Sequence, residues 1–269
     1  TIVAVGVGGT ILRSTNGGNS WTPIVSNSIN NLRGMHFIGA RGWVVGAIGT
    51  ILTTTDSGAT WVTQNSGIQT DLLGVHFIDT QNGWAVGTLG TVLRTTNGGS
   101  TWVQVRSAGS DILRDVHFTS ATTGWAVGGG NNVIRTTDGG LTWSSVNIGT
   151  NFNINSVNFT NATTGIIGGN VGVAYVTNDG GSTWIPVNTG FTDNINSIFF
   201  RSNNTGVAVG TNGRIALFNV SATLPTNFTA IYAKAKQDNK AADVIWTVGS
   251  DKQVVSYTVE RSTDGRNYK

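Results

Sequence analysis

The sequence predicts an all-β protein, a six-bladed β-propeller of four-stranded blades, because three markers share one repeat period. Tryptophan recurs at spacings of 40, 41, 41 and 41 residues, and a phenylalanine and a glycine that ends an apolar step recur with the same spacings. The positions are Trp21, Trp61, Trp102, Trp143 and Trp184; Phe37, Phe77, Phe118, Phe159 and Phe200; and Gly46, Gly87, Gly128, Gly169 and Gly210, with Gly6 one period earlier. A repeat of about 40 residues is typical of a propeller blade.

Each repeat contains four short segments that suit β-strands. In the third repeat they are residues 74–77, 83–87, 90–95 and a segment that starts at Trp102, and clusters of Gly or Asn separate them. Such clusters are typical of turns between strands. No segment keeps a period of 3.6 residues, so almost no helix is expected.

The strand markers also predict the number of blades. Markers for the second and third strands occur six times and those for the first and fourth occur five times, which predicts 22 strands. The two strands that would complete the ring are adjacent in sequence and would lie directly upstream of Thr1. We therefore expect six blades closed by such a segment, with seven as the alternative if further sequence precedes it.

The third and fourth strands of five blades are joined by one motif, [Ser/Thr]-x-[Asp/Asn]-x-Gly-x-[Ser/Thr]-Trp. An Asp or Asn side chain can bond nearby backbone N–H groups in a turn, glycine suits a left-handed backbone, and tryptophan covers the hairpin. These side chains are therefore expected to be structural. They are Asn16, Trp21, Asp56, Trp61, Asn97, Trp102, Asp138, Trp143, Asp179 and Trp184.

This motif is identified as the Asp box, or bacterial neuraminidase repeat. Together with the strings Gly-Trp-Ala-Val-Gly and Gly-Thr-Val-Leu-Arg-Thr-Thr, it makes residues 1–218 resemble the propellers of photosystem II assembly/stability factors and their bacterial relatives. The resemblance implies a propeller fold and a role in recognition, and it names no ligand.

Composition changes near residue 223 and predicts two domains, 1–222 and 223–269. All five Lys and the single Glu of the chain lie in the second part, where the repeat also stops. We expect strands at 228–236, 243–248 and 255–261. The second part resembles the start of a fibronectin type III-like β-sandwich, with Trp246 in its core, and we expect that sandwich to continue beyond Lys269. It also resembles a domain of Bacteroidetes surface proteins, which implies export by the type IX route to the cell surface or the medium.

Composition excludes several classes of site. The chain has no Cys, so disulfides and Cys-ligated metals are excluded. Residues 1–222 carry nine Arg and eight Asp, which gives no basic surface for nucleic acid. No apolar run approaches the 18 residues that would suggest a membrane span. We expect no cofactor.

Enzymatic chemistry is not favoured. A sialidase needs an Arg triad and a Tyr nucleophile beside a Glu, whereas residues 1–222 have no Glu and their single Tyr, Tyr175, falls on an apolar repeat position. His36, His76 and His117 share one position in successive blades, but Asn158 and Phe199 follow them there, so we expect packed histidines and no metal. Trp43, Trp84 and Trp125 are likewise expected in the core, since Val3, Ile166 and Val207 occupy the equivalent positions.

The predicted binding site lies where the repeat varies, on the face formed by the blade-joining loops and the loops between second and third strands. One set of candidates begins the innermost strands near the channel mouth: Arg33, Arg114, Asn155 and Asn196. A second set lies in the blade-joining loops: Arg106, Asp111, Phe152 and Phe191. The leading hypothesis is a secreted or cell-surface binding or scaffold propeller that recognises a protein or glycan partner. An assembly or stability factor is the alternative, and a sialidase-like glycoside hydrolase is the disfavoured third.

Overall fold

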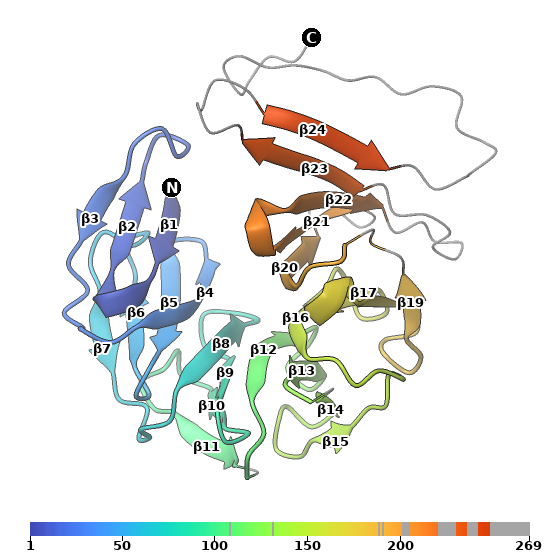
Figure 1. Ribbon diagram of the computed structural model, residues 1–269. Helices are drawn as coiled ribbons and strands as arrows, with labels where there is room; N and C mark the ends of the chain where they lie inside the picture. The colour runs from blue at the N-terminus through green and yellow to red at the C-terminus, as the bar shows by residue number, and fades with distance from the viewer. Residues whose placement is uncertain are drawn as a thin grey trace.

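The computed structural model describes residues 1–219 except 108, 131, 188, 190 and 201–204, together with two strands at 230–235 and 242–247. Six antiparallel sheets follow one another around a ring (Figure 1). The first sheet contains β1 (Ile2–Val5), β2 (Ile11–Ser14) and β3 (Thr22–Ile24). The second contains β4 (Leu32–Ile38), β5 (Arg41–Gly46), β6 (Ile51–Thr54) and β7 (Val62–Gln64). The third contains β8 (Leu72–Phe77), β9 (Gly83–Gly87), β10 (Val92–Thr95) and β11 (Val103–Arg106). The fourth sheet contains β12 (Leu113–Phe118), β13 (Gly124–Gly128), β14 (Val133–Thr136) and β15 (Ser144–Ser145). The fifth contains β16 (Ile154–Phe159), β17 (Gly165–Gly169), β18 (Ala174–Thr177) and β19 (Ile185–Val187). The sixth contains β20 (Ile195–Phe200), β21 (Thr205–Gly210) and β22 (Ile215–Asn219).

The predicted six-bladed propeller is confirmed. The four middle sheets have four strands each, and the first and last have three each in the described part of the chain, as the sequence markers predict. In the described part of the chain, three short 3-10 turns occur between second and third strands, namely η1 (Val7–Gly9), η2 (Asn170–Gly172) and η3 (Thr211–Gly213). Among the described residues, no helix has the length and apolar character needed to cross a lipid bilayer.

The repeated glycine at the start of each second strand has a steric cause. Gly124 pairs with Phe118 of the innermost strand, and a Cβ atom added to Gly124 would lie 2.6 Å from the phenylalanine ring. Real Cβ atoms essentially never come so close, and added Cβ atoms at Gly42, Gly83 and Gly165 would overlap the equivalent rings in the same way. In these four blades the glycine therefore leaves room for a phenylalanine ring to lie across the second strand.

Stacked aromatic rings join successive blades. Trp43 of β5 stacks on Phe77 of the next blade with ring centroids 3.5 Å apart, and Trp84 stacks on Phe118 in the same way. The indole Nε1 of Trp43 donates a hydrogen bond of 3.1 Å to the carbonyl of Gly98, which also lies one blade later. Trp43, Trp84 and Trp125 are fully buried, so their predicted place in the core is confirmed.

The Asp-box hairpins are closed by side-chain hydrogen bonds. In the second blade, Asp56 Oδ1 accepts the backbone N–H of Thr60 at 2.9 Å, and Asp56 Oδ2 accepts the Thr60 hydroxyl at 2.6 Å. The hydroxyl of Thr54 accepts the N–H of Gly58, and the Trp61 indole donates to the carbonyl of Gly58 at 3.2 Å. These bonds hold the hairpin that carries the tryptophan.

The same bonds acidify the Asp-box carboxyl groups. Hydrogen bonds from Thr142 and Thr136 lower the pKa of Asp138 to about 2, and bonds from Thr183 lower the pKa of Asp179 to about 2. The pKa of Asp56 is lowered as well, chiefly by its bonds from Thr60. The three carboxylates are therefore charged acceptors at neutral pH and hold the hairpins as anions.

The C-terminal part is described only as two strands. β23 (Ala230–Ala235) and β24 (Ala242–Thr247) pair antiparallel, with Ile231 opposite Trp246, at two of the three predicted positions. The third predicted strand, the boundary at 222/223 and the expected side-chain packing of a sandwich lie outside the described residues. The fibronectin type III-like identity and the type IX route stay predictions.

Candidate functional site

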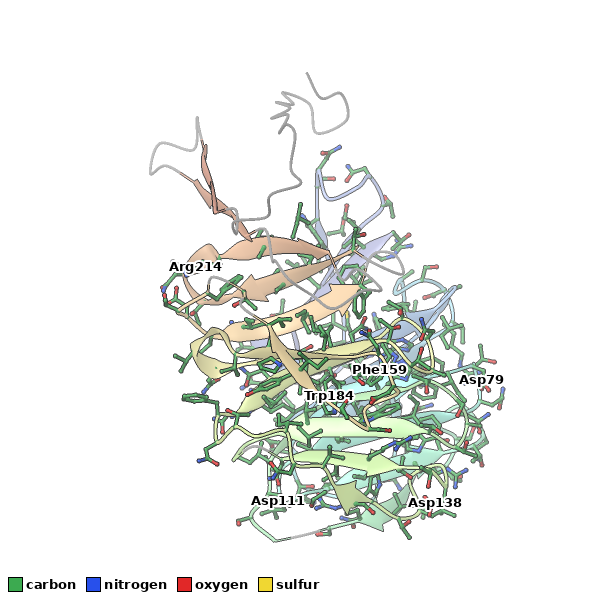
Figure 2. The ribbon with its side chains drawn as sticks, turned by 90° about the vertical axis from the view of Figure 1, so that its right-hand side faces the viewer. Asp79, Asp111, Asp138, Phe159, Trp184 and Arg214 are labelled. Carbon is green, nitrogen blue, oxygen red and sulfur yellow. The ribbon has the colours of Figure 1, made fainter. Side chains whose placement is uncertain are left out.

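The blade-joining loops and the loops between second and third strands lie on one face, which we call the loop face. The N–H of Gly49 donates to the carbonyl of Thr70 at 2.8 Å, and the N–H of Gly90 donates to the carbonyl of Asp111 at 2.7 Å, so each pair of loops is bonded together. Figure 2 shows Asp111 and Arg214 on this side of the ring and Asp138 of an Asp box on the other. The two loop sets therefore open together, as the sequence predicts.

A cavity of about 380 Å³ lies at the channel mouth on the loop face. Its lining includes all four candidates that were predicted at the start of the innermost strands. The lining residues are Arg33, Leu73, Arg114, Asn155, Asn170, Asn194 and Asn196. The structure thus brings together residues from five blades that are far apart in sequence.

Hydrogen bonds fix some of these side chains and leave others open. Asn155 Nδ2 donates to Asn170 Oδ1 at 2.9 Å and to the carbonyl of Ile195 at 2.8 Å, so this amide is tied to its own blade and the next. Arg33 Nη2 lies 3.7 Å from Asp71 Oδ2, which is a loose ion pair. Arg114 Nε is buried and has no hydrogen-bond partner in the structure. The mouth therefore presents guanidinium donors that suit an oxygen acceptor on a ligand.

Asn170 and Asn194 were missed in the sequence. Asn194 Oδ1 accepts the N–H of Val171 at 3.1 Å, and Asp71 accepts the N–H of Ile48 in the equivalent place. Asn31 and Asn153 occupy the same repeat position in their blades, and each accepts a loop N–H in the same manner. A recurring Asn or Asp directly before an innermost strand is the sequence signal for these loop anchors.

Arg106 and Asp111 brace their loop. Arg106 Nη2 lies 3.1 Å from Asp111 Oδ2, and Arg106 Nη1 donates to the carbonyl of Gly90 at 2.8 Å. The ion pair between these two side chains thus holds together the two ends of the third blade-joining loop. They were predicted as ligand contacts, and this stays a prediction; within the fold they bond to each other and to the backbone.

Phe152 and Phe191 differ in exposure, although both were expected to be exposed in loops. Phe152 is 46% exposed, whereas Phe191 is only 6% exposed and packs with Val187 and Ile195 in the core of the fifth and sixth blades. The guanidinium of Arg214 lies 5.8 Å from the Phe191 ring. The expectation that Phe191 is exposed is therefore wrong, because its ring packs between residues of the fifth and sixth blades.

Replacing the two phenylalanines separately should expose this difference. Phe191→Ala is expected to lower the free energy of unfolding by about 3 kcal/mol, because it empties a buried ring site. Phe152→Ala should change it by less than about 0.5 kcal/mol, as expected of an exposed side chain. Urea unfolding of both variants measures the effect, and equal losses would contradict the assigned burial.

Three exposed aliphatic residues at the tips of the loop face adopt a left-handed backbone. Ile48, Leu89 and Val171 have φ angles of 54°, 56° and 57° and are 55%, 50% and 53% exposed. Gly8, Gly130 and Asn212 occupy the same repeat position in the other blades with similar φ angles. Glycine and asparagine tolerate this conformation, whereas β-branched residues are strained in it. This feature cannot be predicted from the sequence, because a pattern of apolar residues does not reveal the φ angle.

The three histidines form a stack of rings across successive innermost strands. The ring centroids of His36 and His76 lie 4.6 Å apart, and those of His76 and His117 lie 4.4 Å apart. His36 Nδ1 accepts the N–H of Phe77 in the next blade at 3.3 Å. Burial lowers the pKa of His36 and of His117 to about 4, and it lowers the pKa of His76 well below its usual range. The stack is therefore neutral at physiological pH and joins neighbouring blades.

The charged groups of the described residues do not gather into a metal-binding cluster. Asp115 lies two residues before His117 on the same strand, and it accepts hydrogen bonds from Ser156 Oγ at 2.9 Å and from the N–H of Val157 at 3.0 Å. Burial raises its pKa against the effect of these bonds. Like the histidines, Asp115 ties one innermost strand to the next.

Comparison with known proteins identifies the family to which the chain belongs. A sequence profile described as photosynthesis system II assembly factor YCF48 matches residues 102–268. No curated protein matches the chain. Two solved structures of YCF48 are similar: one bound to a D1 peptide has 19% identity, covers 81% of this chain and 89% of that chain, and has a TM-score of 0.48. The other, from Cyanidioschyzon merolae, has 18% identity, covers 79% and 89%, and has a TM-score of 0.47.

Two glycoside hydrolase structures share the propeller fold. The GH74 enzyme of Niastella koreensis has 17% identity and a TM-score of 0.59, with 88% of this chain and 47% of that chain covered. An ancestral GH74 enzyme has 18% identity and a TM-score of 0.65, with 81% and 35% covered. At this identity the likeness shows the fold alone, and this chain spans less than half of either enzyme.

Proposed function

Because the chain belongs to the photosynthesis system II assembly factor YCF48 family, we propose that it is an assembly or stability factor that binds a protein partner through its loop face. The observation that carries this proposal is the set of exposed aliphatic residues in left-handed backbone, Ile48, Leu89 and Val171. The binding role expected from the sequence is retained, with a protein as the preferred partner.

The three residues cost stability without serving the fold. A non-glycine residue in a left-handed backbone costs on the order of 1 kcal/mol or more. Gly8 and Gly130 show that the same turn forms with glycine, so the aliphatic side chains are not needed to make it. Exposed apolar side chains on a rigid, strained turn are typical of a surface that a partner covers.

The channel mouth supplies the polar part of the same surface. The guanidinium groups of Arg33 and Arg114 line the cavity together with Asn155. A carboxylate or a group of backbone carbonyls would satisfy these donors. The surface thus suits a protein segment that offers oxygen acceptors at its centre and apolar side chains around them.

Replacing the three aliphatic residues by glycine should separate binding from stability. The Ile48→Gly/Leu89→Gly/Val171→Gly variant is expected to keep or raise its melting temperature, because the strain is removed. Its affinity for partner peptides should fall at least about tenfold, because the apolar contacts are lost. The probes are peptides selected from a displayed random library against the unmodified chain, and their dissociation constants are measured by calorimetry.

Leu141 provides a matched control on the opposite face. It is 56% exposed within the Asp box of the fourth blade, where Ser100 and Ser182 occupy the equivalent position. Leu141→Ser should leave peptide affinity unchanged. Loss of binding in this variant, with normal binding in the glycine variant, would show that the Asp-box face binds the partner. Binding on a glycan array that depends on the loop-face residues, without peptide binding, would favour the glycan alternative.

The proposal does not include hydrolysis. Glycoside hydrolysis needs two carboxyl groups flanking the scissile bond, and none of the residues that line the channel-mouth cavity carries one. We further propose that the protein acts at the cell surface or outside the cell, as its C-terminal resemblance implies. Protease treatment of intact cells would test this, since an exported protein is digested and a cytoplasmic one is protected.

A further inference from the structure

A groove of about 620 Å³ lies on the loop face, between the first blade-joining loop and the second blade. Its lining includes Ser28 and Ile29 of that loop, Ile48 and Thr50 of the second blade, and Asn65 of the next loop. None of the residues that line it carries a charge. We propose that this groove binds an aromatic side chain from an uncharged segment of the protein partner. The groove is part of the loop face, so this proposal rests on the function proposed above.

The sixth blade shows how the equivalent space is filled. Phe191 lies four repeats after Ser28, at the same position of its blade-joining loop. Its ring is buried between residues of the fifth and sixth blades, and the guanidinium of Arg214 lies 5.8 Å from it. Thr50 has the position of Arg214 in the second blade. The fold thus places a phenyl ring in the sixth blade where the second blade has an open groove.

The two loops form the same turn at this position. The N–H of Ser28 donates to Ser26 Oγ at 3.2 Å, and the N–H of Phe191 donates to the equivalent Thr189 Oγ1 at 3.1 Å. A side chain at position 28 therefore leaves its loop in the same direction as that of Phe191. The Ser28 hydroxyl accepts the N–H of Asn30 at 3.1 Å, so it stays with its own loop and leaves the groove empty.

The wall of the groove is also fixed in the same way in the two blades. Asn30 Nδ2 donates to Thr50 Oγ1 at 2.8 Å, and Thr50 Oγ1 donates to the carbonyl of Ala47 at 2.7 Å. At the two equivalent positions of the sixth blade, Asp193 Oδ2 pairs with Arg214 Nε at 3.1 Å. The polar groups of this wall are already bonded to one another, and they carry no charge in the second blade. Such a wall suits an apolar ring better than an ion.

Isoleucine side chains border the groove. Ile29 is 90% exposed, Ile48 is 55% exposed on its left-handed backbone, and Ile68 is partly buried. A ring bound beside them would remove their apolar surface from water. Ile48 thereby gains a specific role in binding, because its strained turn places an apolar side chain at the border of the groove.

The third blade differs because an arginine of the chain itself occupies the equivalent space. Arg106 Nη1 donates to the carbonyl of Gly90 at 2.8 Å. In the second blade the two positions are held by Asn65 and Gly49. The Asn65 side chain is short and accepts the N–H of Gly67 instead, and no donor among the described residues bonds to the carbonyl of Gly49. An N–H group of the bound segment can donate to this carbonyl beside the aromatic ring.

Filling the groove from within tests the proposal. Ser28→Phe is expected to keep or raise the melting temperature, because it fills a cavity as Phe191 does in the sixth blade. It should lower the affinity for groove-binding peptides at least about tenfold. Thr150→Phe is the matched control, because Thr150 has the same repeat position in the loop between the fourth and fifth blades. It should leave the affinity unchanged.

The probes are peptides selected from a displayed random library on the unmodified chain, with the Ser28→Phe variant as a soluble competitor that removes peptides bound elsewhere. The enriched peptides are expected to share one aromatic residue with uncharged neighbours. Replacing that residue by Ala should lower the affinity, measured by calorimetry, at least about tenfold. Ile29→Ser gives a reading that does not depend on folding of the filled variant, since Ile29 is 90% exposed, and should weaken binding at least about fivefold.

Several outcomes would overturn the proposal. They are no enrichment under this competition, enriched peptides that lack an aromatic residue, equal affinity for the unmodified chain and Ser28→Phe, or an equal loss in Thr150→Phe. The glycine variant of the loop face separates the two proposals. If that variant loses the affinity for peptides selected without the competitor while Ser28→Phe retains it, the loop face binds a partner but the groove does not. If only Leu141→Ser loses that affinity, the loop-face function itself fails.

Discussion

The stability of the protein is expected to fall steeply as the pH is lowered from about 6.5 to about 4, and the fall should largely disappear in the His36→Asn/His76→Asn/His117→Asn variant. Burial lowers the pKa of His36 and of His117 to about 4, from an ordinary value of 6.5. As the pH falls through this window, the unfolded chain binds protons that the folded chain does not. Stability is therefore complete above about pH 6.5 and is lost progressively toward pH 4.

The loss of stability that we expect between pH 6.5 and pH 4 is large, although lowering the pH removes no side chain. One pKa unit corresponds to about 1.4 kcal/mol, so His36 and His117 each account for about 3 kcal/mol across the window. His76 lies between them with its pKa lowered in the same direction, and its charge would be repelled by both neighbours. Asp115 is present in both proteins, so its contribution cancels in the comparison.

Asparagine is the natural replacement at this position. Asn158 holds it in the fifth blade, where its Oδ1 accepts the N–H of Phe200 as the His36 ring accepts that of Phe77. The triple variant should therefore keep the inter-blade bonds and lose the titration. Urea unfolding near pH 7 and near pH 4.5 measures both proteins, and an equal loss in the two would contradict the assignment to the histidines.

Trp102→Ala is expected to lower the free energy of unfolding by about 3–5 kcal/mol, as in other large-to-small core substitutions. Trp102 is nearly buried, packs edge-on against Phe77 with ring centroids 5.8 Å apart, and donates from Nε1 to Gln64 Oε1 at 3.2 Å. Removing the indole leaves a cavity between the hairpin and the blade.

Trp21→Ala is the matched control, because Trp21 has the same place in its Asp box but, among the described residues, packs against no phenylalanine ring. Its loss should be about 1 kcal/mol, the size usual for a half-exposed residue. Chemical unfolding of both variants at neutral pH gives the two values. A loss at Trp21 as large as that at Trp102 would show that the hairpin alone, and not the Phe contact, holds the tryptophan.

The sequence predicts the propeller well, because the residues that repeat are those that the blade geometry requires. Gly83 must leave room for Phe77, so a glycine recurs at this position in five blades, and Trp84 fills the space between blades at a position where every blade has an apolar residue. The channel-mouth position of Arg33 and Arg114 follows from the same periodicity. A shared repeat position places residues around a common axis even when they are 81 residues apart.

Features that depend on loop conformation were not predictable in this way. An apolar residue after the second strand gives no sign of its φ angle, so the strain at Ile48 and Val171 is seen only in the structure. Phe191 is buried although it lies in a blade-joining segment, and Arg106 pairs with Asp111 five residues later. These contacts are set by the path of each loop, which differs from blade to blade and has no periodic signature.

The contacts that join the blades connect only successive repeats. Trp43 reaches Gly98 and Trp84 reaches Gly139, each 55 residues later, and the histidine bonds span a single period. The array therefore behaves as a nearest-neighbour chain of similar modules, whose energy is a sum of module and junction terms. Duplication or deletion of one 41-residue module would preserve every type of junction and alter only the curvature needed for closure. Ring size can thus change in evolution by recombination within the repeat, without the invention of a new interface.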